Sequence, residues 1–190
     1  GEWAFDQTDE EKDELKELMP YVRRLPWMMT VSMPGNKRFH VVHAEIQPIQ
    51  DTTDGDILVD HEEMLKYPCY DGPVALWGRS HFVGLCGNDL TPRNLKKHRR
   101  GAILHGACQW MESPHLSDIY VGHTPMNAPV RFDKLVNLDT FAYGLYKGRY
   151  KRCGLTMTEP ATGRFWTVDL DDVKEVECLS VPNIGDSNES

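Results

Sequence analysis

Two histidines stand where predicted strands end, and they carry the clearest chemical signal in the sequence. His43 lies in the segment 41–44, which reads Val-Val-His-Ala, and His123 lies in the segment 121–124, which reads Val-Gly-His-Thr. A strand fixes the direction of its backbone, its end exposes the imidazole at a sheet edge, and neutral imidazole is a ligand suited to zinc, iron or manganese. A lone histidine is more often a partly buried side chain bonded to the backbone, so both interpretations stay open.

Arg79 is the third candidate, at the end of the tripeptide Trp77-Gly78-Arg79. A planar guanidinium on a loop can bind two phosphate oxygens at once. Considered alone, an arginine in this position is also compatible with an ordinary surface residue. The basic run of residues 96–100 has no aromatic interleaving and lies in a chain of net charge -8, so it favours a solvated face or an acidic partner over nucleic acid.

Other catalytic patterns lack local support. The chain contains no Gly-x-Ser-x-Gly elbow, no glycine-rich phosphate loop ending in Lys-Ser or Lys-Thr, and no Gly-x-Gly-x-x-Gly after a predicted strand. Five cysteines form an odd set without a Cys-x-x-Cys pair, which indicates neither a disulfide scaffold nor a zinc ribbon. We therefore expect a reducing, cytoplasmic setting.

Length and composition predict one domain. A chain of 190 residues that is 40% hydrophobic can bury a substantial core, and we expect a single domain over residues 1–181 with a flexible polar tail over 182–190. No apolar run approaches the ~20 residues of a membrane helix, and the first residues resemble no export signal. The sequence therefore predicts a protein without membrane or nucleic-acid partners.

An amphipathic helix is predicted near the start of the chain. Thr8 and Glu11 have the spacing of a capping box, and Pro26 makes Leu25 the expected last residue. Its apolar stripe is formed by Leu15, Leu18, Met19 and Val22. This spacing predicts a surface helix whose acidic side faces solvent.

Two hairpins and two further strands are predicted beyond it. Segments 27–33 and 39–42 flank the turn Pro34-Gly35-Asn36-Lys37, and segments 155–158 and 164–170 flank Pro160-Ala161-Thr162-Gly163. The other expected elements are strands at 119–121 and 135–138, a loop at 47–55, a short helix at 59–66, and one helix from Thr91-Pro92 that Gly101 and Gly106 should interrupt.

Six segments in order resemble landmarks of a known family, the small phage and bacterial serine/threonine phosphoprotein phosphatases, which are calcineurin-like metallophosphoesterases with two metal ions. The dinucleoside tetraphosphatases share much of the pattern, which covers residues 1–145. The segments are Gly1-Glu2-Trp3-Ala4-Phe5, Leu25-Pro26, Val42-His43-Ala44, Leu76-Trp77-Gly78-Arg79, Gly122-His123-Thr124-Pro125 and Asn137-Leu138-Asp139-Thr140.

The resemblance implies a fold, a set of site residues and a cofactor. The fold would be α/β, the C-terminal part of an αββα sandwich with mixed sheets and flanking helices. His43 and His123 would be ligands of the second of two divalent metal ions, most often manganese, with iron or zinc as alternatives, and Arg79 would bind the substrate phosphate. Phe141 stands where relatives commonly have glycine, and the region after Arg79 is longer than expected.

The resemblance also implies that part of the site comes from elsewhere. Relatives carry Asp-x-His, Asp-x-x-Asp-Arg and Asn-His-Glu motifs ahead of these landmarks, and none of the three occurs in the sequence. No catalytic acid or base is therefore identifiable, and we expect this chain alone to bind metal weakly and to hydrolyse little. The implied function is hydrolysis of a phosphorylated protein or small phosphoester once an N-terminal segment completes the site; self-association could instead cover the exposed sheet. The alternatives are a noncatalytic binding or assembly protein and a dinucleoside polyphosphate hydrolase.

Overall fold

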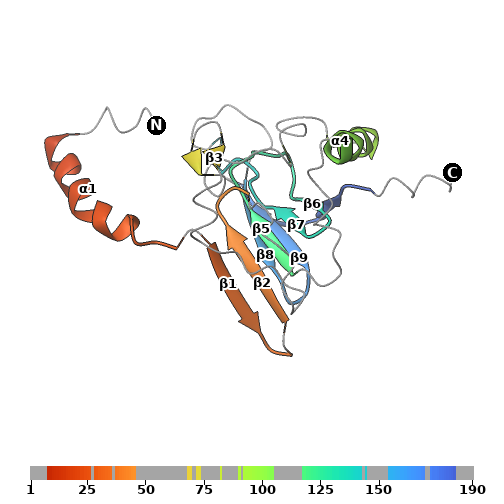
Figure 1. Cartoon of the computed structure of the whole chain (residues 1–190), viewed down its shortest axis with the longest axis horizontal. Helices are drawn as coiled ribbons and strands as arrows, with labels where there is room; N and C mark the ends of the chain where they lie inside the picture. The colour runs from red at the N-terminus through yellow and green to blue at the C-terminus, as the bar shows by residue number, and fades with distance from the viewer. Residues whose placement is uncertain are drawn as a thin grey trace.

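The computed structural model shows an α/β protein with one large mixed sheet and two smaller antiparallel sheets (Figure 1). It describes residues 8–26, 28–35, 37–45, 68–69, 72–73, 82, 90, 92–104, 117–142, 144, 154–169 and 172–182. The predicted loop at 47–55 and the predicted helix at 59–66 lie outside these ranges. Neither helix that the structure describes has the length and apolar character needed to cross a membrane.

The large sheet has six strands and carries the predicted histidines at one edge. In spatial order they are β1 (Met28–Met33), β2 (Lys37–Val42), β5 (Asp118–Val121), β7 (Leu135–Asn137), β6 (Val130–Phe132) and β11 (Leu179–Ser180). Strand β2 runs parallel to β5, and β5 runs parallel to β7. The carboxyl ends of these three strands therefore meet at one edge of the sheet.

Both predicted hairpins are confirmed. Strands β1 and β2 pair antiparallel from Met28 opposite Val42 to Met33 opposite Lys37, and Gly35 in their turn has a φ of 78°. A positive φ is accessible to glycine at little cost, which is why the turn forms where the sequence places it. The second hairpin joins β8 (Leu155–Glu159) to β9 (Arg164–Val168) through a turn that contains Gly163, whose φ is 70°.

Five strands were not predicted from the sequence, and three of them belong to the two larger sheets. These are β6, β11 and β10 (Val173–Val176), the last of which pairs with β9 to complete a three-stranded sheet. Strand β6 has three residues and β11 has two, so neither is long enough to show a period-two pattern. The remaining two-stranded sheet joins β3 (Pro68–Cys69) to β4 (Gly72–Pro73).

A hydrophobic cluster packs the six-stranded sheet against the three-stranded sheet. Tyr120 of β5 and Val136 of β7 are buried against Phe165 of β9. Phe39 of β2 meets the Tyr120 ring edge-on, with ring centroids 5.4 Å apart and an interplanar angle of 88°. The cluster thus holds the parallel strands β2, β5 and β7 from one side and fixes the strand ends that carry the candidate site.

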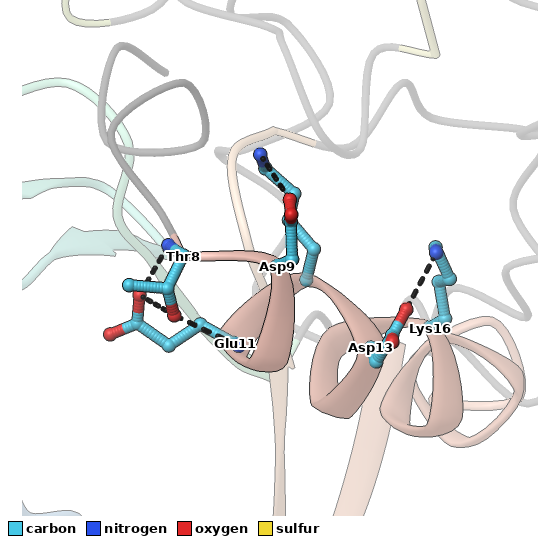
Figure 2. Close-up of polar contacts among 6 residues, drawn as sticks. Thr8, Asp9, Glu11, Asp13 and Lys16 are labelled. Atoms are coloured by element: carbon cyan, nitrogen blue, oxygen red, sulfur yellow. Dashed lines mark hydrogen bonds and ion pairs between the residues drawn. The ribbon is translucent and has the colours of Figure 1, made fainter.

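Helix α1 (Asp9–Val22) begins with the predicted capping box. The Thr8 amide donates to Glu11 at 2.7 Å, and the Glu11 amide donates to the Thr8 hydroxyl at 3.3 Å (Figure 2). Ion pairs three residues apart follow on the surface, with Lys16 and Asp13 separated by 2.7 Å. The helix ends at Val22, three residues before the predicted Leu25. From there to Leu25 the chain forms turns, in which the amides of Arg24 and Leu25 donate to the carbonyl oxygens of Tyr21 and Val22.

The apolar stripe of α1 is more exposed than an amphipathic helix would lead one to expect. Leu18, Met19 and Val22 keep 55%, 42% and 52% of their surface exposed, and no α1 side chain is buried. Figure 1 shows α1 lying beyond the edge of the sheets, on the side of β1. In the described part of the chain, α1 is therefore stabilised by its cap and its local ion pairs rather than by tertiary packing.

Helix α4 (Pro92–Leu104) begins at the predicted proline, but it continues through Gly101, which was expected to interrupt it. A single interior glycine costs only about 1 kcal/mol relative to alanine, and tertiary contacts can offset that loss. Those contacts come from Arg99, whose side chain is 2% exposed, donates to Asp133 at 3.0 Å and lies 5.1 Å from the centroid of the Phe132 ring. Arg99 thus anchors α4 to the turn between β6 and β7.

Candidate functional site

The two predicted histidines leave adjacent parallel strands at the same edge of the large sheet. Val41 of β2 pairs with Tyr120 of β5, so the next residues of both strands emerge side by side. Just beyond the paired residues, the amide of Gly122 donates to the carbonyl oxygen of His43 at 2.9 Å. This backbone hydrogen bond holds together the two segments that carry the imidazoles.

The imidazole rings of His43 and His123 are in direct contact. Nε2 of His43 lies 3.1 Å from Nδ1 of His123, and the ring centroids are 5.0 Å apart with an interplanar angle of 59°. The separation is that of an N–H···N hydrogen bond, and it also falls within the range of about 3 to 4 Å expected between two ligands of one ion. His43 is exposed, whereas His123 is half-buried and its Nε2 atom is shielded from solvent. The pair therefore forms a polar, partly open site at the sheet edge.

The distance between the two nitrogens is compatible with a shared metal ion. An ion about 2.1 Å from each nitrogen would be bonded to them at an angle of about 95°, close to the 90° between neighbouring ligands of an octahedron. Neutral imidazole is also the right donor for zinc, iron or manganese. Among the described residues, no group of three or more histidine, cysteine, aspartate or glutamate side chains is placed to hold an ion.

His123 adopts a backbone conformation that is rare for a residue with a side chain. Its φ is 66°, and the Thr124 amide donates to the carbonyl oxygen of Gly122 at 2.8 Å, which closes a tight three-residue turn around His123. Such a conformation costs about 1 to 3 kcal/mol and persists only where its surroundings hold it in place. The turn directs the imidazole of His123 toward that of His43.

A polar residue of β7 that was not assigned a role from the sequence holds this turn. Asn137 is fully buried, donates from Nδ2 to the carbonyl oxygen of Thr124 at 2.9 Å, and accepts at Oδ1 from the amide of Asp139 at 2.8 Å. The Met126 amide donates to the carbonyl oxygen of Asp139 at 2.8 Å. The only sequence signal was the place of Asn137 within the last family landmark.

The segment after Asn137 is tied to the three-stranded sheet by hydroxyl groups. Thr140 donates to the carbonyl oxygen of Gly154 at 2.7 Å and contacts the hydroxyl of Thr156 at 2.7 Å. Thr156 in turn contacts the hydroxyl of Thr167 at 3.0 Å. Buried hydroxyls that satisfy one another in this way fix the position of the loop beside the histidine pair.

Phe141 has a backbone conformation that glycine adopts more readily than phenylalanine. Its φ is 64°, and its amide donates to Oδ1 of Asp139 at 2.9 Å. Glycine adopts a positive φ without a steric penalty, which fits the glycine common at this place in the family that the sequence resembles. Phe141 adopts this positive φ with a side chain and bears the strain.

Arg79 lies outside the described residues, so its place beside the histidine pair stays a prediction. A scan against protein-family models and a search of curated proteins found no match. The resemblance to phosphatases therefore stays a prediction from the sequence motifs. The fold and site together define an α/β protein with a histidine pair at the carboxyl edge of a mixed sheet.

Proposed function

We propose that this chain is the C-terminal part of a metal-dependent phosphoester hydrolase of the phage-type serine/threonine phosphatase kind. The observation that carries the proposal is the 3.1 Å separation of His43 Nε2 and His123 Nδ1. These two potential metal ligands are 80 positions apart in the sequence, yet they meet at the ends of parallel strands. A strained backbone at His123 adds support, since such strain is concentrated at functional sites.

In this proposal His43 and His123 bind one divalent ion, with manganese as the expected metal. When bound, the ion would stabilise the negative charge that develops on the oxygens of the transferred phosphoryl group. Arg79 would bind two of those oxygens through its planar guanidinium and orient the phosphate for in-line attack. His43 is exposed, so its side of the pair is open to solvent, which supports access by an external substrate.

The finer fold assignment belongs to the same proposal. Packing of the three-stranded sheet on the six-stranded sheet through Tyr120, Val136 and Phe165 supports an αββα sandwich of the metallophosphoesterase type. The remaining ligands and the general acid would come from a segment with the three motifs that the sequence lacks. The substrate would be a cytoplasmic phosphoprotein or small phosphoester, and a dinucleoside polyphosphate is an alternative within the same chemistry.

The reading frame upstream of Gly1 provides the test. We expect it to encode the Asp-x-His, Asp-x-x-Asp-Arg and Asn-His-Glu motifs, and the longer protein to hydrolyse p-nitrophenyl phosphate and a phosphoserine peptide with Mn²⁺. Replacing His43 or His123 by alanine in that protein should abolish turnover. A longer protein with all three motifs and full activity after either replacement would refute the proposal.

A noncatalytic binding or assembly protein is the second candidate. It is favoured by the finding that the described residues place two, and not three or more, metal-ligating side chains together. Light scattering and a thermal melt of the 190-residue chain discriminate the two. A stable monomer with a cooperative melt favours the noncatalytic protein, whereas self-association or a requirement for a second chain favours the phosphatase.

A further inference from the structure

The buried amide of Asn137 joins the two backbone segments that flank the histidine pair. Its Nδ2 atom donates to Thr124, the residue directly after His123, and its Oδ1 atom accepts from the amide of Asp139. Only this orientation of the amide places a donor against an acceptor at both contacts. In the reverse orientation, Oδ1 would face the Thr124 carbonyl oxygen and Nδ2 would face the Asp139 amide, so two acceptors would meet at one contact and two donors at the other. The side chain of Asn137 thus has one arrangement that satisfies all of these groups.

The contact with Thr124 matters because the His123 turn is strained. At a φ of 66°, the backbone of His123 would relax toward an extended conformation unless neighbouring groups prevented it. Two of the restraining bonds run through the chain around Asn137, namely Asn137 to the Thr124 carbonyl and the Met126 amide to the Asp139 carbonyl. Loss of the Asn137 side-chain amide would release the carbonyl group of Thr124, the residue after His123.

We infer that Asn137 is a positioning residue, which keeps Nδ1 of His123 within ligand distance of Nε2 of His43. The inference rests on the proposed metal site, since its functional consequence is the affinity for a shared ion. Replacing hydrogen-bonded residues that orient metal ligands typically weakens binding by about 10- to 100-fold. Asn137 is therefore expected to govern metal affinity without touching the ion.

The test follows the histidine ring resonances of the 190-residue chain by long-range ¹H–¹⁵N NMR during addition of Mn²⁺, whose unpaired electrons broaden nearby nuclei. Among the eight histidines, His43 and His123 should broaden together and at the lowest Mn²⁺ concentration. Asn137→Asp keeps the shape and the acceptor but removes the donor to Thr124, and should raise the Mn²⁺ concentration for half-broadening about 10-fold or more. If a buried carboxylate prevents folding, Asn137→Ala removes the same donor without adding a charge and should give the same increase.

Asp133→Asn is the matched control. Asp133 lies in the turn before β7, at the opposite end of the strand from Asn137. This substitution replaces a carboxylate by an amide, the opposite of Asn137→Asp. It should lower the melting temperature through the loss of the Arg99 ion pair while leaving the Mn²⁺ response at the wild-type value. An equal change of the Mn²⁺ response in both variants would mean general destabilisation and would overturn the inference.

The outcomes separate the inference from the proposal on which it rests. The chain is expected to bind Mn²⁺ weakly, so the titration extends to saturation of the other histidine responses; if His43 and His123 of the wild-type chain still do not broaden together, the shared metal site is wrong and the proposed function fails. If they broaden together and the Asn137 variants respond at the same Mn²⁺ concentration as wild type, the metal site stands and the role of Asn137 alone is refuted.

Discussion

The carbonyl oxygen of His43 accepts a hydrogen bond from the amide of Gly122 at 2.9 Å, so the backbones that carry the two imidazoles are joined directly. This contact leaves little space at Gly122. A Cβ atom built on Gly122 would lie 3.4 Å from the His43 carbonyl oxygen and 3.7 Å from Cβ of Asp139. The spacing of the histidine pair should therefore depend on the size of the residue at position 122.

We predict that Gly122→Ala is tolerated and that Gly122→Val is not. A single methyl group fits at ordinary contact distance, whereas the branches of valine must push β2 and β5 apart, at a cost of about 1 to 3 kcal/mol in the free energy of unfolding. Urea denaturation measures the free energy of unfolding, and the Mn²⁺ affinity reports whether the histidine pair keeps its spacing. Gly122→Val with wild-type stability and wild-type metal affinity would show that the close approach has no role.

The ion pair between Arg99 and Asp133 should be important for stability. The Arg99 side chain is 2% exposed, so Asp133→Asn would remove a countercharge at 3.0 Å from a buried guanidinium and lower the free energy of unfolding by about 3 kcal/mol. Adding Arg99→Met should recover most of the loss, because the buried guanidinium charge is then removed. A double variant no more stable than Asp133→Asn would contradict this explanation.

Arg79 should matter for turnover far more than for folding. In the intact phosphatase, Arg79→Ala would remove a donor aimed at the phosphoryl oxygens and should lower kcat/KM by about 100-fold or more. Arg79→Lys keeps the charge but loses the planar fork, so it should recover only part of the rate. Comparable losses of activity and of melting temperature would instead identify Arg79 as a structural residue.

Cys178 should be chemically protected in the folded chain. Burial raises the pKa of its thiol to about 11, and the charge of Arg131 offsets only part of that effect. Because the folded pKa exceeds the unfolded value, the associated stability is complete below about pH 8.5 and is lost as the pH rises toward 11. At pH 8, iodoacetamide should modify Cys178 roughly 100-fold more slowly in the native chain than in urea. Equal rates by mass spectrometry would contradict the protection.

The sequence predicts those parts of this fold that depend on local chemistry. Both hairpins form where expected because Gly35 and Gly163 supply the positive φ values that their turns need. Strands β6 and β11 were missed because their pairing joins residues 130–131 to residues 179–180, a contact that no local pattern encodes. Helix α4 continues through Gly101 because Arg99 is anchored by Asp133, which is equally non-local.

The candidate site divides in the same way. His43 and His123 could be selected from the sequence because each follows a short apolar run at a strand end. Asn137 could not be assigned its role, because its amide acts on Thr124 through a contact between strand β7 and the turn after β5. A buried asparagine in a three-residue strand has no sequence pattern that distinguishes it from an exposed one.

The most direct test of the central claim is a crystal structure of this chain grown with Mn²⁺ and measured at a wavelength where manganese scatters anomalously. We predict an anomalous peak between the two rings, about 2.1 Å from both His43 Nε2 and His123 Nδ1, with His43→Ala removing it. A peak bound to one imidazole alone, or an unchanged 3.1 Å contact between the two nitrogens with no peak at saturating Mn²⁺, would contradict the shared metal site.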